Sequence, residues 1–247
     1  MRNLTIDIGN TSIKYAIFDG KEMMYNDRLI GHDMDLLADK IAGWEIDNSM
    51  ICSTIKLDIS QIATIQQNTG NIQLLTYKTP VPVTNLYKSP QTLGMDRLAA
   101  VIGAFSQSHD NTLVIDLGTA ITYDFINCKG EYMGGNISPG MDMRLKSLHE
   151  HTDSLPLVKP EGKQPWIGED TESAIRCGVT NGIRYEIDGY IRKLSLKYHN
   201  LCVFFTGGDH LYFEDEIKLR IFADNYLVLK GLNEIILFNE RIKTDDI

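Results

Sequence analysis

The sequence lacks the cysteine pairs and the long apolar runs that mark several classes of protein. Its four cysteines are too far apart to form a CxxC pair, which argues against a zinc site or a thiol redox motif; they are Cys52, Cys128, Cys177 and Cys202. No apolar stretch approaches the roughly 18 residues of a membrane span. The N-terminus is a strand-like run and not a charged and then apolar signal sequence. We therefore expect a cytoplasmic protein with no membrane partner.

The sequence also lacks an excess of basic residues. Its 24 basic and 33 acidic side chains give a formal net charge of −9, which argues against a nucleic-acid partner and against docking on anionic lipid. The six histidines show no metal-ligand spacing. A small phosphorylated ligand is still compatible with this charge, because a glycine-rich turn and single Lys or Arg side chains bind phosphate on an acidic protein.

An internal repeat is the most informative feature that the sequence does contain. The segment LTIDIGNTSIKYAIFDG, which starts at Leu4, aligns with LVIDLGTAITYDFINCKG, which starts at Leu113, once Asn10 is left out. The identical pairs are Leu4 and Leu113, Ile6 and Ile115, Asp7 and Asp116, Gly9 and Gly118, Thr11 and Thr119, Ile13 and Ile121, and Tyr15 and Tyr123. Chance rarely gives Asp-x-Gly-Thr and a second strand in register, so the repeat indicates a duplicated fold.

Each copy of the repeat predicts a strand, a tight glycine turn and a second strand. Further turns at Asp19-Gly20 and Lys129-Gly130 make each copy the start of an antiparallel meander. Apolar residues at helical spacing predict helices over 94–107 and 172–198, and strands are expected at 50–55 and 201–208. We therefore predict an α/β protein of two duplicated halves, residues 1–110 and 111–247, with the active site in the cleft between them.

A carboxylate inside an apolar strand is costly unless it has a partner. Asp7 and Asp116 each lie in such a strand just before the glycine turn, whose backbone N–H groups and neighbouring side chains are suited to phosphate oxygens. The carboxylates themselves would hold a cation that bridges to the phosphates, with Lys14 within reach. An ordinary turn explains either copy alone, but the pair favours phosphate or cation binding.

Five motifs occur in the order DIGNTSIK, LGMDR, DLGTAITYD, GGNISPG and TGGD between Asp7 and Asp209. Two halves with DIGNT and DLGTA resemble the superfamily of acetate and sugar kinases, Hsp70 and actin, whose halves are ribonuclease H-like. The full set, in a chain this short, is similar to type III pantothenate kinases. This resemblance implies ATP-dependent phosphorylation of pantothenate to 4'-phosphopantothenate, the first step of coenzyme A biosynthesis. The alternative is an actin- or Hsp70-like assembly or regulatory protein, against which the short length of the chain argues.

The resemblance assigns roles to the first half of the chain. It implies that the ATP phosphates and Mg²⁺ are held by the hairpin that runs from Asp7 to Lys14, namely Asp7, Ile8, Gly9, Asn10, Thr11, Ser12, Ile13 and Lys14. It makes Asp96 the general base that takes a proton from the pantothenate hydroxyl. An acid in a first helical turn also stabilises the helix dipole, and that is the alternative role of Asp96. Substrate contacts are implied for Tyr87, Gly94, Met95, Asp96 and Arg97.

The second half supplies the remaining expected contacts. Asp116 resembles the ligand of a monovalent cation, either K⁺ or NH₄⁺, and Thr119 resembles a second ATP contact. Thr171 resembles a substrate-binding threonine, although its place before a helix is equally typical of an N-cap. The resemblance also implies a homodimer. The predicted helix over 172–198 has an apolar face that suits either such an interface or the core.

Overall fold

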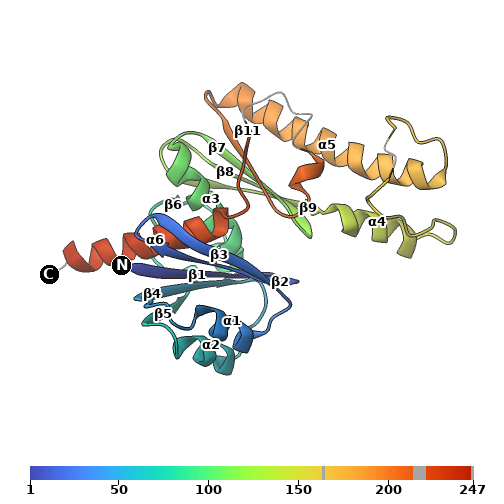
Figure 1. Cartoon of the computed structure of the whole chain (residues 1–247). Helices are drawn as coiled ribbons and strands as arrows, with labels where there is room; N and C mark the ends of the chain where they lie inside the picture. Colours follow the sequence, from blue (N-terminus) through green and yellow to red (C-terminus); the bar gives the residue numbers. More distant parts are fainter. Residues whose placement is uncertain (163–164, 214–220, 246–247) are drawn as a thin grey trace. The chain divides into compact units, whose positions relative to one another are not determined.

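The computed structural model describes residues 1–162, 165–213 and 221–245 and contains two compact units (Figure 1). The first unit comprises Met1–His109, Lys129–Met133 and Tyr226–Ile247, and the second comprises Asp110–Cys128 and Gly134–Asn225. The C-terminal helix α6 (Leu227–Asp245) thus groups with the N-terminal residues. The boundary between the two duplicated halves, placed between residues 110 and 111 from the sequence, stays a prediction.

The first unit is built on a sheet of order β3-β2-β1-β4-β5. Strands β1 (Arg2–Ile8), β2 (Ser12–Asp19) and β3 (Glu22–Ile30) form the predicted antiparallel meander, and β4 (Asn48–Ser53) and β5 (Asn71–Leu74) continue it in parallel. Alternate residues such as Ile6 and Tyr15 are fully buried in a core shared with α1 (Met34–Ile41) and α2 (Ile59–Gln66).

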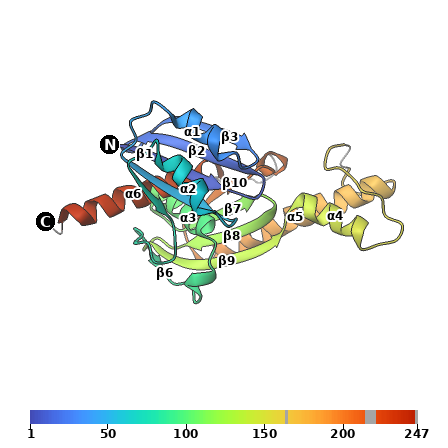
Figure 2. The same ribbon diagram turned by 90° about the horizontal axis from the view of Figure 1, so that it is seen from below.

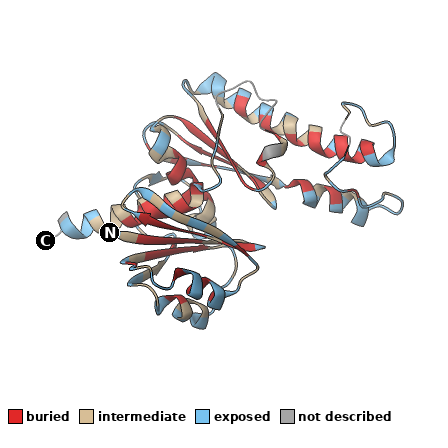
Figure 3. Ribbon diagram, in the orientation of Figure 1, coloured by how far each residue is buried: buried red, intermediate tan, exposed pale blue. Residues whose placement is uncertain are grey.

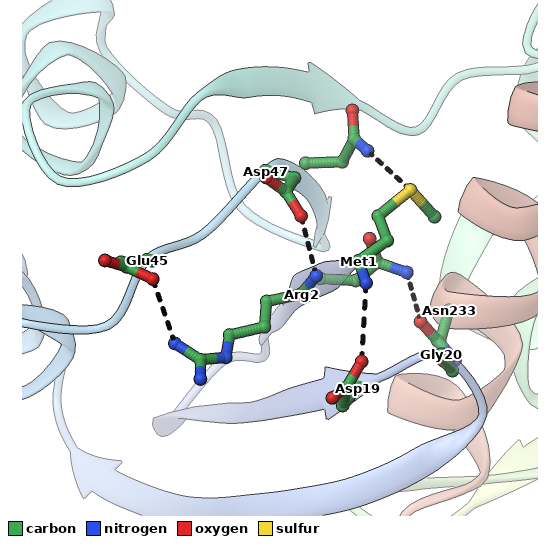
Figure 4. Close-up of polar contacts among 9 residues, drawn as sticks. Met1, Arg2, Asp19, Gly20, Glu45, Asp47 and Asn233 are labelled. Carbon is green, nitrogen blue, oxygen red and sulfur yellow. Dashed lines mark hydrogen bonds and ion pairs between the residues drawn. The ribbon is translucent and has the colours of Figure 1, made fainter.

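The opposite face of this sheet is covered by two helices. Helix α6 contacts β1, β2 and β4, and it packs along α3 (Met95–Ser108), the helix predicted over 94–107 (Figure 2). A buried amide pair fixes α6: Asn233 Nδ2 donates to Gly20 O at 2.9 Å, and Asn3 Nδ2 donates to Asn233 Oδ1 at 2.8 Å. Figure 4 shows Asn233 beside the ion pairs at the start of β1.

The second unit repeats the strand order of the first. Its sheet runs β9-β8-β7-β10-β11, formed by β9 (Glu131–Pro139), β8 (Ala120–Ile126), β7 (Thr112–Leu117), β10 (Cys202–Thr206) and β11 (Ile221–Ala223). The pairing also agrees, since β7 and β8 are antiparallel while β7, β10 and β11 are parallel. The short strand β6 (Thr84–Asn85) pairs with the first residues of β9. This matching topology confirms the predicted duplication.

Helices α4 (Met141–Glu150) and α5 (Thr171–Lys197) complete the second unit, and two short 3₁₀ helices (Pro90–Thr92 and His210–Tyr212) complete the chain. Figure 3 shows a buried stripe on α5 and an exposed face opposite it. The stripe consists of the predicted core residues, each at most 8% exposed: Ile175, Val179, Ile183, Ile187 and Ile191. None of the described helices combines the length and the apolar composition that crossing a membrane requires.

Candidate active site

The β1–β2 hairpin presents its tip to solvent. Asn10 and Thr11 are exposed, and the turn is closed by a hydrogen bond from Gly9 N to Ser12 O at 3.0 Å. The loop after β3 braces the tip, because Gly31 N donates to Thr11 O at 2.9 Å and His32 Nε2 donates to Gly9 O at 2.8 Å. The side chains of Ile8 and Ile13 are fully buried, so only their backbone groups are available to a ligand. The hairpin therefore offers a braced, open backbone.

Asp7 and Asp96 lie close to a common neighbour, the thiol of Cys52. Asp7 is opposite Cys52 in the pairing of β1 with β4, and Asp96 stands in the first turn of α3. Burial raises the pKa of Cys52 well above its ordinary value, and the negative charges of Asp7 and Asp96 raise it further. The first unit thus brings together two carboxylates that are 89 positions apart in the sequence (96 minus 7).

The N-terminus of α3 holds the predicted substrate contacts in a fixed arrangement. Gly94 is the N-cap, and a Cβ placed on it would lie 2.5 Å from Asp96 Oδ1, which accepts a hydrogen bond from Arg97 N at 2.9 Å. The buried Arg97 guanidinium lies 5.9 Å from the ring centroid of Tyr87, and that ring stacks on Tyr132. Gly94 therefore leaves room for the Asp96 carboxylate, and the Arg97 guanidinium lies beside the aromatic ring of Tyr87.

Asp116 occupies the equivalent strand position in the second unit. It is partly buried near the end of β7 and pairs with Thr122 across the β7–β8 hairpin. A Cβ would lie 3.1 Å from Asp116 Oδ1 if placed on Gly118, and 2.6 Å from it if placed on Gly207. Gly207 has a φ of +91°, which disfavours any other residue. Two glycine backbones thus approach one carboxylate oxygen closely, and a carboxylate oxygen is a usual ligand of a cation.

The GGNISPG segment packs against the turn that follows Asp116. Gly140 N donates to Thr119 O at 3.1 Å, and a Cβ on Gly140 would overlap the backbone of Gly118 and Thr119. The Thr119 side chain remains exposed. Nearby, Asp209 N donates to Leu117 O at 3.0 Å, and burial, with the charge of Asp142, raises the pKa of the Asp209 carboxyl. Three loops that contain glycine therefore converge on the end of β7.

Thr171 is not the N-cap of α5, which corrects the alternative drawn from the sequence. The N-cap is Asp170, whose Oδ1 accepts a hydrogen bond from Ser173 N at 2.7 Å. Thr171 is the first residue of the helix, is exposed, and lines an open pocket of about 610 Å³ together with Ser154, Pro156, Asp170 and Glu172. Its hydroxyl is therefore not engaged as a helix cap, which leaves the expected substrate role open.

One charged residue beside the hairpin, Arg28, is not predicted from the sequence. Arg28 on β3 lies directly opposite Lys14, and Arg28 Nε donates to Ser12 Oγ at 3.0 Å. The turn at Asp19-Gly20 was the only sequence signal that could have placed Arg28, since the residues of two strands can be paired by counting outward from the turn between them. This counting gives the wrong partner, because a bulge between Ile17 and Phe18 shifts the register by one residue.

Comparisons with known proteins identify the family to which the chain is similar. The sequence model of the family described as type III pantothenate kinase matches residues 3–193. A relative from Phocaeicola vulgatus that bears this name is 49% identical over 242 residues, covering 97% of this chain and 100% of the relative.

Two solved structures are similar in fold. One is a Baf family protein from Campylobacter jejuni, with a TM-score of 0.65 and 21% identity over 96% of this chain and 99% of that one. The other is the activator of 2-hydroxyisocaproyl-CoA dehydratase from Clostridium difficile, solved with ADPNP, with a TM-score of 0.55 and 11% identity over 100% and 97% of the two chains. The duplicated actin-like fold is therefore shown by structure. Together with the matched sequence model and the closely similar relative, it shows that the chain belongs to the type III pantothenate kinase family.

Proposed function

We propose that the chain transfers the γ-phosphoryl group of ATP to the primary hydroxyl of pantothenate, an alcohol acceptor, and so makes 4'-phosphopantothenate for coenzyme A biosynthesis. The observation that carries this proposal is the full-length match to type III pantothenate kinases. Relatives with that name do not favour an assembly or regulatory role. The four free cysteines suit an enzyme of the cytoplasm, where ATP is available.

Asp96 is the general base of this proposal. An ordinary Asp has a pKa of about 3.9 and is a weak base. It suffices here because the transition state of phosphoryl transfer is loose, so that orienting the hydroxyl matters more than removing its proton fully. Gly94 gives the carboxylate its space, while Arg97, beside Tyr87, is assigned to an anionic group, either the pantothenate carboxylate or the transferring phosphoryl. Met95 and Thr171 are assigned to pantothenate through the family resemblance.

The β1–β2 hairpin is assigned to the ATP phosphates. The fit is supported by the open backbone at Gly9, where a Cβ would meet only Ser12 O at 3.6 Å, and by the cation at Lys14. Asp7 would hold Mg²⁺, which neutralises charge on the phosphates during transfer. Among the described residues no group of three or more His, Cys, Asp or Glu side chains forms a metal cluster, so phosphate oxygens would complete the magnesium shell.

Asp116 is assigned to a monovalent cation, and Thr119 beside it to ATP. The carboxylate of Asp116 is an oxygen ligand that suits K⁺ or NH₄⁺, and the backbones of Gly118 and Gly207 lie close to it. Such an ion supplies positive charge near the phosphates when it is bound. The preference for a monovalent ion over a divalent one rests on the family resemblance.

The direct test is a coupled assay of ADP release. We expect ADP release to depend on pantothenate and to fall at least about tenfold when potassium is replaced by sodium, since a site that binds K⁺ or NH₄⁺ holds a smaller ion at different ligand distances. The variant Asp116→Asn should lose most of this dependence on potassium. ADP release that pantothenate does not stimulate would refute the kinase assignment, whereas equal rates in the two salts would refute only the cation site.

We also propose that the protein is a homodimer formed through the exposed face of α5. Gly178, Gly182, Tyr185 and Gly189 recur at helical spacing on this face, and Tyr185 is 61% exposed. Trp166, 76% exposed, donates its indole N–H to Tyr185 Oη at 3.1 Å. Small residues permit close helix packing and exposed aromatics are typical of the centre of an interface. A second copy of the same face is therefore the proposed partner.

The variant Tyr185→Asp should convert the dimer to a monomer, because in a symmetric interface it places two like charges close together. Light scattering coupled to size exclusion would measure this directly. Tyr77→Asp is the matched control, since Tyr77 is a 46% exposed tyrosine that belongs to the first unit and not to α5. A wild-type chain that elutes as a monomer at micromolar concentration would contradict the proposal.

A further inference from the structure

A lateral row of polar residues crosses the first sheet at the end where the hairpin lies. Arg28 on β3 is opposite Lys14 on β2, which is opposite Asp7 on β1, which is opposite Cys52 on β4. Residues directly opposite each other in a sheet project from the same face. Arg28 therefore shares its face with the carboxylate assigned to Mg²⁺ and with the lysine assigned to phosphate.

The two cations in this row, Lys14 and Arg28, are neighbours, and neither forms an ion pair with a described carboxylate. No described carboxylate lies within ion-pair distance of either Lys14 or Arg28. Like charges directly opposite each other destabilise a sheet, and this chain has a net charge of −9, so acidic partners are abundant elsewhere. An unpaired cation pair in such a protein indicates that an anion from outside the chain is its partner.

The direction of the Arg28 side chain is set by one hydrogen bond. Its Nε donates to Ser12 Oγ at 3.0 Å, which holds the guanidinium beside the first residue of β2, next to the hairpin tip. Ser12 Oγ is the acceptor in this contact and keeps its own proton for another acceptor. The two terminal nitrogens of Arg28 have no acceptor among the described residues, so the planar edge that suits phosphate oxygens is available.

We infer that Arg28 binds the polyphosphate chain of the nucleotide, with Lys14 and the Ser12 hydroxyl completing the same phosphate site. Strands lie about 4.8 Å apart, so the backbone of Arg28 is roughly 10 Å from that of Asp7 across two strand spacings. That separation leaves the space above Lys14 for phosphates between Arg28 and the cation at Asp7. The inference rests on the proposed use of ATP, but it concerns a residue that the family resemblance did not assign.

The test compares Arg28→Gln with wild type in binding and in turnover. We expect the affinity for inorganic tripolyphosphate and the KM for ATP to weaken about tenfold to a hundredfold, the usual loss for a charge-assisted bidentate contact. The KM for pantothenate and the affinity for adenosine should stay within about twofold. The tripolyphosphate affinity of Arg28→Lys should lie between those of wild type and Arg28→Gln, because lysine keeps the charge and lacks the planar guanidinium. Arg2→Gln is the matched control, since Arg2 pairs with Glu45 at the far end of β1 (Figure 4).

Thermal melting separates this role from a structural one. Because Arg28→Gln removes one of two opposed cations, the melting temperature of the free protein should stay unchanged or rise. The increase in melting temperature that tripolyphosphate produces should become smaller. A lower melting temperature together with unchanged tripolyphosphate affinity would make Arg28 a structural residue and overturn the inference. The tripolyphosphate measurement needs no pantothenate, so a chain that fails as a pantothenate kinase still gives a decisive result for Arg28.

Discussion

Replacing Asp96 by Asn is expected to lower kcat by about 10²–10⁴-fold while the KM for ATP changes by less than about twofold. The amide keeps an oxygen that accepts the hydrogen bond from Arg97 N, made at 2.9 Å in the protein, so the start of α3 should not rearrange. What the amide loses is the ability to take a proton from the pantothenate hydroxyl. Steady-state ADP release measures kcat and KM, and retained binding of a nonhydrolysable ATP analogue shows that the nucleotide site is intact.

The alternative role of Asp96, stabilisation of the helix dipole, makes a different prediction. An acid in a first turn is worth about 0.3–1 kcal/mol, so Asp96→Asn would then lower the melting temperature slightly and leave turnover near wild type. Asp35→Asn is the matched control, because Asp35 is also an acid in a first helical turn of the same unit. Turnover by Asp96→Asn at half the wild-type rate or more would remove Asp96 as the base.

The parts of the fold that could be predicted are those that local patterns specify. The repeat marked Asp7 and Asp116 because a carboxylate in an apolar strand stands out from its neighbours. Helix α5 was predictable because its core face recurs at i, i+4 and i+8 from Ile175, and it begins one residue before the expected position. The match in strand order between the two sheets then follows from duplication.

The register of paired strands and the contacts between residues far apart in the sequence could not be predicted. Counting back from the turn at Asp19-Gly20 pairs Lys14 with Asp27, but the bulge between Ile17 and Phe18 pairs it with Arg28. A shift of one residue exchanges the faces of a strand, so Asp27 instead accepts hydrogen bonds from Tyr15 and Tyr25 on the core side. The approach of Gly207 to Asp116 joins residues 91 positions apart (207 minus 116), and no local pattern reports such a contact.

Helix α6 was missed for a similar reason, because it carries no recognisable motif, yet it contacts the strand of Asp7 and the helix of Asp96. Its crossing with α3 depends on Gly231 and Gly103. A Cβ on Gly231 would overlap the carbonyl of Ala99, and a Cβ on Gly103 would lie 2.9 Å from Gly231 N. Glycine inside a helix costs about 1 kcal/mol relative to alanine, so both residues are explained by the close approach of the two backbones.

Replacing Gly231 by Ala is therefore expected to destabilise the first unit strongly. The intrinsic gain of about 1 kcal/mol from the better helix former is outweighed, because the obstacle is backbone and cannot swing aside as a side chain would. The helices must separate, and we expect a net loss of about 2–4 kcal/mol. For a chain of this size that corresponds to a decrease in melting temperature of about 5–15 °C, measured by thermal denaturation followed by circular dichroism.

The same change should also reduce activity at temperatures where the protein is folded, because separating α6 from α3 displaces the helix that begins at Met95, next to Asp96. Gly103→Ala, on α3, should have the same effect. The double variant should lose less stability than the sum of the two single losses, since one separation of the helices relieves both overlaps. Arg241→Ala, an exposed change on the same helix, is the control and should melt within about 2 °C of wild type. Should Gly231→Ala melt as high as wild type, the close crossing would have to be rejected, and with it the account of how α6 holds Asp7 and Asp96 in place.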